Sequence, residues 1–198
     1  KLCAHPCDGY ILRPCHAPVM AHAFQGKHPP TVFVGAGAKR TDLTCAPLVR
    51  IDMEDAIVRV LRLLAAEGYR RIGFISYASS ERSEEERELY EDTMAKLGLP
   101  YRASEFCPLN DKAALPMMRR MFSPSVRPEA VYVGDDIVLR HVLPAWQALD
   151  IAPGDDLGVI TLAARGNPLP DGFKWSRMEF NPFQVGRVAV DCLLQEIQ

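Results

Sequence analysis

Apolar and polar residues follow one another along this chain in blocks with either helical or strand periodicity. After Asp52, apolar side chains recur at the spacing of one helix face, at Ile57, Val60, Leu61 and Leu64. Asp52 is the expected N-cap, because its carboxylate can accept hydrogen bonds from N–H groups of the first turn. Gly68 is expected to end the helix, and the apolar run 72–75 then predicts a strand covered on both faces. The block predicts one half of a β-α-β unit.

The same alternation continues through the rest of the chain. Further strands are expected at 9–13, 31–34, 100–106, 130–133, 157–162 and 174–179. Further helices are expected at 83–97, 110–122, 137–149 and 183–197, with a weaker one at 17–25. Ser83 and Glu86 have the spacing of a capping box, so the helix there is expected to begin at Ser83. Alternating strands and helices predict an α/β fold with parallel sheets between layers of helices.

Composition and charge limit the possible classes of protein. The chain has 198 residues, 48% hydrophobic and 24% charged, which is enough for one globular domain or two small lobes. The net charge of −2 gives no electrostatic reason for this segment to bind nucleic acid. No apolar run approaches the roughly 20 residues that cross a bilayer, so no membrane partner is expected. The opening residues have the character of the middle of a domain, so we expect a fragment of a longer protein.

Cysteine and histidine usage does not predict a metal site or a disulfide framework. The chain contains six cysteines, but it is too long and too rich in apolar residues for a disulfide scaffold. Cys107 and Cys192 adjoin apolar segments and are expected to be buried thiols. Possible zinc ligands gather near the start, at Cys3, His5, Cys7, Cys15 and His16. Their spacing lacks the usual two-residue gap and no second pair follows, so we expect no metal and no cofactor.

Enzyme motifs are also missing from the sequence. The residues Gly35, Ala36 and Gly37 lack the third glycine and the following helix of a phosphate-binding loop. There is no Ser-His-Asp order, no HExxH and no pair of carboxylates with a plausible catalytic partner. We therefore expect a protein that is not an enzyme. An α/β enzyme acting on a nucleotide or phosphate remains a weaker alternative that rests on the Gly35 loop alone.

The order of motifs resembles the effector-sensing core of LacI-family transcription regulators, which share the periplasmic-binding-protein fold. The matching segments are 8–12, 49–52, 64–75, 96–99, 128–136, 155–160 and 181–187. Together they cover nearly the whole chain, and their order and spacing are more specific than any segment alone.

The resemblance implies two lobes, each a parallel sheet flanked by helices, joined by three crossovers. Residues 1–48 and 162–178 would form what is present of the N-terminal lobe, and residues 49–161 and 179–198 the C-terminal lobe. It also implies that the N-terminal lobe is incomplete, because its first strands and helices lie before Lys1. The DNA-binding helix-turn-helix would precede them.

The resemblance further implies that a ligand is held in the cleft between the lobes by residues at strand ends. The ligand-binding candidates are Arg13, Ser79, Ser80, Arg82, Arg87 and Asp135. Arg82 and Arg87 are possible substitutes for the family's sugar-binding arginine, whose position is taken by Glu86. Each has a simpler alternative: Asp135 can be a helix cap, and both arginines can be solvated residues at a helix start.

Two departures from the family pattern bear on the ligand. The family's Gly-Phe-Asp-Asp after the late strand reads Thr161 to Ala164 here, and Leu109 stands where an aromatic platform is expected. Because unpaired ligand hydroxyls cost roughly 1–3 kcal/mol each in a buried site, these losses favour an atypical, less polar or anionic effector over a sugar-like one, or a site that has lost sensing.

The sequence thus predicts the ligand-sensing and dimerisation domain of a bacterial LacI-type regulator. Its expected partners are a small-molecule effector, a second copy of the chain and, through the helix-turn-helix, operator DNA. The expected location is the cytoplasm. The alternative is an extracytoplasmic solute-binding receptor of a transporter, which six thiols in an oxidising compartment disfavour.

Overall fold

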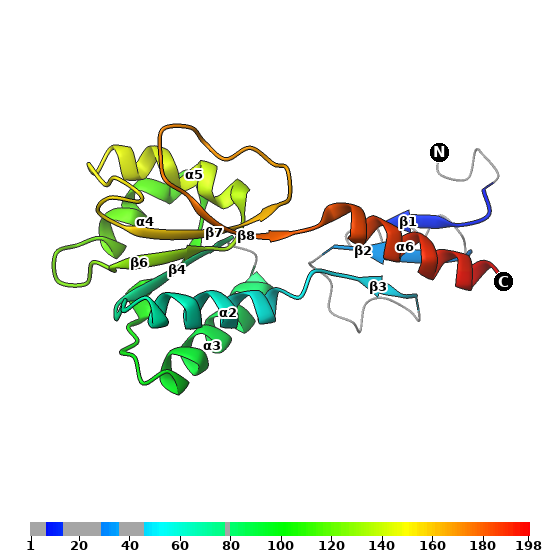
Figure 1. Ribbon diagram of the computed structural model, residues 1–198, viewed down its shortest axis with the longest axis horizontal. Coiled ribbons are helices and arrows are strands. Elements are labelled where there is room, and N and C mark those ends of the chain that lie inside the picture. The colour runs from blue at the N-terminus through cyan, green and yellow to red at the C-terminus, as the bar shows by residue number, and fades with distance from the viewer. Residues whose placement is uncertain (1–6, 14–28, 36–45, 78–79) are drawn as a thin grey trace. The chain divides into compact units, whose positions relative to one another are not determined.

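The chain folds into two compact units. A computed structural model (Figure 1) describes residues 7–13, 29–35, 46–77 and 80–198. The first unit comprises residues 1–51 and 181–198, and the second comprises residues 52–180. Among the described residues, no helix has the length and apolar character that a bilayer span requires.

The first unit is a small parallel sheet covered by the last helix. Its strand order is β1-β2-β3, with bounds β1 Tyr10–Leu12, β2 Thr31–Val34 and β3 Leu48–Val49. Helix α6, Pro182–Ile197, packs on this sheet, and Val32, Val49 and Ala189 form the buried centre of the contact. Asn181 caps α6, because its Oδ1 accepts from the Phe183 N–H at 3.1 Å.

The second unit has three layers around a five-stranded sheet in which every strand is parallel to its neighbours. The strand order is β5-β4-β6-β7-β8, with bounds β4 Ile72–Tyr77, β5 Phe106–Leu109, β6 Ala130–Val133, β7 Gly158–Ala164 and β8 Ser176–Phe180. The helices are α2 Met53–Ala66, α3 Ser80–Lys96, α4 Ala114–Met121 and α5 Asp136–Gln147, with short 3-10 turns at η3 Ala103–Glu105 and η4 Asp111–Ala113.

Each face of this sheet carries its own hydrophobic core. Helices α2 and α3 cover one face, where Phe74 stacks on Tyr132 with ring centroids 4.9 Å apart. Helices α4 and α5 cover the other face, where Trp146 packs edge-on against Phe122. The two layers are visible on opposite sides of the sheet in Figure 1. Because both faces are buried, the strands read as nearly continuous apolar runs.

Helix α2 shows how local sequence produces this arrangement. Asp52 caps it, with its Oδ1 accepting from the Asp55 N–H at 2.9 Å. The four apolar residues of the predicted stripe are at most 3% exposed, namely Ile57, Val60, Leu61 and Leu64. Gly68 has φ +95°, the left-handed conformation that glycine adopts at low cost. The predicted cap, buried face and stop of α2 are all confirmed.

Several predicted boundaries are wrong, and side-chain contacts bear on two of them. Helix α3 begins at Ser80 and not at Ser83, and Glu86 is not a capping residue, since it is buried and accepts a hydrogen bond from the Ser76 hydroxyl. Strand β5 begins at Phe106, where the predicted strand 100–106 ends. Glu105 is the reason for the second shift: its carboxylate accepts from the Arg102 N–H at 3.0 Å and closes a 3-10 turn that delays the strand.

The division into lobes also differs from the expectation, at two segments. Residues 162–178 were expected in the N-terminal lobe, but β7 and β8 pair in the sheet of the second unit, with Ile160 opposite Ser176. The last helix was expected in the C-terminal lobe, but α6 belongs to the first unit, where Ala189 is 1% exposed. The physical reason is burial: Met178 and Phe180 complete the core beside α2, and α6 buries Ala189 against the sheet of the first unit.

Candidate functional site

The carboxyl edge of the five-stranded sheet is the candidate site. Because all five strands are parallel, their carboxyl ends meet at one edge, where ligands bind in open α/β sheets. Four strands there end in or lead into a polar or aromatic residue: Tyr77 ends β4, and Asn110, Asp135 and Arg165 follow close after β5, β6 and β7. This edge therefore combines hydrogen-bond acceptors, donors and an aromatic ring.

Asp135 follows β6 and caps α5. Its Oδ1 accepts from the N–H groups of Ile137 and Val138, both at 2.8 Å. A carboxylate has about four acceptor positions on its two oxygens, so Asp135 can cap the helix and still accept a hydroxyl from a ligand. The helix-cap alternative is thus observed, and it is compatible with a ligand contact.

A buried polar pair lies at the end of β4. Ser76 is 4% exposed and Glu86 6% exposed, and the Ser76 hydroxyl donates to Glu86 Oε2. Sequence analysis did not identify Glu86 as buried. The signal was present, because Glu86 lies one turn before Tyr90 and extends the buried stripe of α3 by one position.

An exposed polar network lies between β7, β8 and the start of α5. Arg177 pairs with Glu179 at 2.9 Å, and Arg165 pairs with the same carboxylate at 3.4 Å. Asn167 donates through Nδ2 to Asp136 Oδ2 at 3.2 Å. The sequence offered only a weak signal for this network, the i, i+2 spacing that puts Arg177 and Glu179 on one side of a strand.

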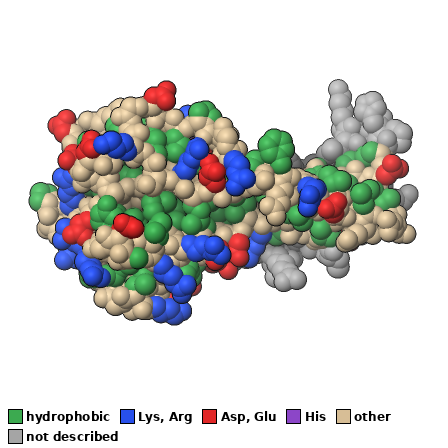
Figure 2. All heavy atoms as spheres, in the orientation of Figure 1, with side chains coloured by type: hydrophobic (Ala, Val, Ile, Leu, Met, Phe, Trp, Pro, Cys, Tyr) green, Lys and Arg blue, Asp and Glu red, His purple; other side chains and the backbone are tan. Residues whose placement is uncertain are grey.

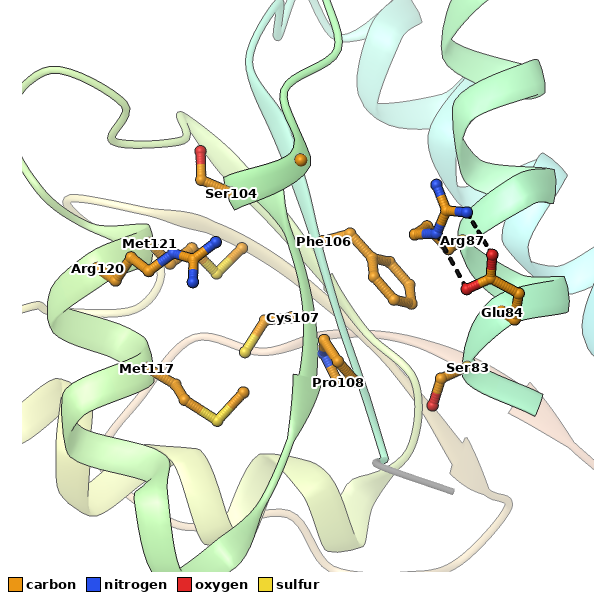
Figure 3. Close-up of a pocket in the computed structure, with 11 residues that line it drawn as sticks. Ser83, Glu84, Arg87, Ser104, Phe106, Cys107, Pro108, Met117, Arg120 and Met121 are labelled. Carbon is orange, nitrogen blue, oxygen red and sulfur yellow. Dashed lines mark hydrogen bonds and ion pairs between the residues drawn. The ribbon is translucent and has the colours of Figure 1, made fainter. Parts of the chain in front are cut away.

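Arg87 is the one predicted arginine of α3 whose side chain is described, and it lies beside β5. It forms ion pairs with Glu84 and Glu91, and the hydrogen bond that it donates to Glu84 is the largest cause that raises the pKa of Arg87. Both side chains of the Arg87–Glu84 pair line a cavity of about 350 Å³ next to Phe106 (Figure 3). The structure therefore gives Arg87 two carboxylate partners of its own.

The structure places the remaining candidates only in part. Arg13 follows β1 in the first unit and is exposed. Ser80 and Arg82 belong to the first turn of α3, and their side chains lie outside the described set, as does Ser79 altogether. The weak helix expected at 17–25 and most of the possible zinc ligands also lie outside the described residues: Cys3, His5, Cys15 and His16.

Metal binding finds no support in the part of the chain that the structure describes. No group of three or more His, Cys, Asp or Glu side chains comes together there. Cys107 is buried as predicted, whereas Cys192 is only partly buried and Cys7 is exposed; these three described cysteines are free thiols.

Comparison with known proteins identifies the class. The model of the periplasmic binding protein-like domain matches residues 61–198, and the chain belongs to that family. Comparison with curated proteins gives no match at the sequence level.

Solved structures agree with this assignment. A LacI family transcriptional regulator from Lactobacillus casei with bound sucrose is 21% identical, with a TM-score of 0.69 over 96% of this chain and 71% of that chain. A regulatory protein of the LacI family from Chloroflexus aggregans is 19% identical, with a TM-score of 0.70 over 96% and 69%. A transcription regulator from Lactobacillus plantarum is 16% identical, with a TM-score of 0.72 over 98% and 73%. The predicted periplasmic-binding-protein-like fold, with parallel sheets flanked by helices, is confirmed.

Proposed function

We propose that this chain is the effector-binding and dimerisation domain of a LacI-type transcription regulator, and that it binds a small polyhydroxylated molecule at the carboxyl edge of the five-stranded sheet. The observation that carries the proposal is the parallel sheet, which brings Tyr77, Asn110, Asp135 and Arg165 to one edge. The family match supports a ligand-binding role, and the sucrose in the Lactobacillus casei structure supports a sugar-like ligand.

The chemistry of the edge suits such a ligand. Asp135 supplies carboxylate oxygens that accept hydrogen bonds from hydroxyl groups. The Asn110 Oδ1 accepts from the Lys112 backbone N–H at 3.1 Å, and its NH2 group can donate to a ligand. Tyr77 is 46% exposed and offers an aromatic face for the C–H side of a sugar ring. Together these groups match a molecule with several hydroxyls and one apolar face.

The remaining candidates stay predictions within this proposal, namely Arg13, Ser79, Ser80 and Arg82. Arg87 stays a prediction as well. To bind a ligand at the carboxyl edge, its guanidinium must give up its ion pairs with Glu84 and Glu91.

Regulation would follow from a population shift. The effector changes the equilibrium between two arrangements of the domain only if it binds one more tightly than the other. In a cytoplasmic homodimer, that shift would reposition two helix-turn-helix heads on operator DNA. On the visible face of the second unit, described Lys and Arg side chains alternate with Asp and Glu (Figure 2), so the proposal assigns DNA contact to the separate heads.

Titration of a panel of mono- and disaccharides, followed by calorimetry, tests the ligand site. The Asp135→Asn variant keeps a capping oxygen but loses the charge, and it is expected to weaken binding about tenfold. Asp156→Asn is the matched control, because Asp156 Oδ2 also accepts a backbone N–H, from Ala152 at 3.3 Å, but lies before β7 at the opposite edge of the sheet.

Equal effects of both variants, or no binding by any member of the panel, would contradict a sugar site at this edge. Light scattering tests the dimer separately. A monomer at all concentrations that nevertheless binds a sugar would favour the solute-binding receptor.

A further inference from the structure

The free edge of β5 carries a cavity, and the proposed function does not use the side of it that α4 lines. Strand β5 is the outermost strand of its sheet, and a cavity of about 350 Å³ runs around it between α3 and α4. This volume lies within the roughly 300–1,000 Å³ of small-molecule sites. The carboxyl-edge residues Tyr77, Asn110 and Asp135 are not among its lining residues.

The α4 side of the cavity has an apolar floor and a polar rim. Met117, Met121 and Cys107 gather on this side of β5, with Arg120 beside Met121 and Ser104 above them (Figure 3). Met117 is partly buried, so its thioether presents an apolar surface that can adapt its shape, and Met121, which is 1% exposed, backs this wall of the cavity.

The two arginines of the cavity differ in their partners. Arg87, on the α3 side, is balanced by Glu84 and Glu91. The Arg120 side chain forms no ion pair or hydrogen bond with the described part of the chain, and its charge acts on the Cys107 thiol, opposing the rise in pKa that burial causes. Among the described residues, the α4 side therefore has a positive charge without an acidic partner, next to apolar surface.

We propose that this cavity is a second ligand site, which takes a small amphipathic carboxylate: its acid group pairs with Arg120 and Ser104, and its apolar body lies on Met117, beside Met121 and Cys107. Charge complementarity selects an anion, and the thioether floor selects an apolar body. A peptide strand fits the edge less well, because β5 has only four residues and Pro108 has no N–H to donate to an added strand.

Methionine methyl NMR of the whole chain tests the site with phenylacetate as the probe. Phenylacetate is expected to shift the Met117 and Met121 methyl resonances saturably, with a Kd of about 1 mM. The Met178 methyl, on β8 at the other end of the sheet, is expected to stay unchanged. Acetate lacks the apolar body and 2-phenylethanol lacks the charge, so each is expected to bind at least about tenfold more weakly.

Two variants locate the charge. Arg120→Gln is expected to weaken phenylacetate binding about tenfold, and Arg119→Gln less than about twofold, because Arg119 is an exposed neighbour on α4 that does not line the cavity. Equal losses of phenylacetate affinity in both variants would mean that only non-specific electrostatic attraction to α4 is involved, and would overturn the proposal. So would acetate binding as tightly as phenylacetate, or the absence of any saturable shift at Met117 and Met121.

Discussion

Leucine-to-alanine substitutions on the two sides of α2 provide a direct test of the fold. Leu61 is 0% exposed and Leu63, two residues later on the same helix, is 49% exposed. Both substitutions remove the same three carbons and change helix propensity equally, so the difference between them isolates burial.

The expected magnitudes follow from those exposures. Removing three fully buried carbons costs about 2.4 kcal/mol at ~0.8 kcal/mol per carbon, and the remaining cavity raises the loss to about 3–4 kcal/mol for Leu61→Ala. Leu63 loses at most about half of the transfer contribution and leaves no closed cavity, so Leu63→Ala should cost about 1 kcal/mol or less. The two variants should therefore differ by about 2 kcal/mol or more.

Urea unfolding followed by tryptophan fluorescence suits this measurement. The chain has two tryptophans, Trp146 and Trp175, and both lie in the second unit together with α2. Fluorescence therefore reports the unit that carries the substitutions, even if the two units unfold separately. Equal losses of unfolding free energy in the two variants, or a larger loss for Leu63→Ala, would refute the assignment of the buried face of α2.

Three further measurements test backbone conformation and electrostatics. Gly68→Ala is expected to cost about 1 kcal/mol, because Gly68 has φ +95° and the added methyl has open space, so the cost is conformational. Gly186→Ala also meets open space but has ordinary helical φ within α6, so it is expected to stabilise the first unit by about 0.5–1 kcal/mol, and a loss there would contradict the helix. The pKa of Glu129 in the folded protein is lowered from 4.5, chiefly by hydrogen bonds from the backbone N–H groups of Arg70 and Arg71. The ionised Glu129 carboxylate therefore stabilises the fold above pH 4.5, and this contribution is lost as the pH falls through its folded-state pKa. The difference in unfolding free energy between wild type and Glu129→Gln should therefore shrink in acid, and a difference that does not change with pH would refute this.

Local sequence was enough to predict several elements of the second unit. The strand 130–133 and the cap, stripe and stop of α2 follow from patterns within a few residues, and the structure confirms them. It was not enough for β5, because the 3-10 turn at Glu105 depends on a side-chain contact that competes with strand formation. Local sequence also could not predict the strand order β5-β4-β6-β7-β8, since strand pairing joins residues far apart in the chain.

The candidate site shows the same division. The sequence put Asp135 at the end of a strand and the start of a helix, and both of these local features are observed. It gave two conflicting signals for Glu86: the spacing to Tyr90 favours burial, but a glutamate in an acidic run has the sequence signature of a solvated helix start. Only the packing of α3 on β4 decides that this carboxylate faces inward.

Periodicity, capping residues and glycine positions determined which segments of this protein are helices and strands, because those signals act over one or two turns. They also determined that β8 and α6 each have a side to bury. Only the tertiary structure decided what each would be buried against: β8 completes the sheet of the second unit and α6 covers the sheet of the first. The physical reason is that the hydrophobic effect depends on the apolar area removed from water and not on which partner covers it. A pattern therefore predicts that a face is buried, but not the surface that buries it.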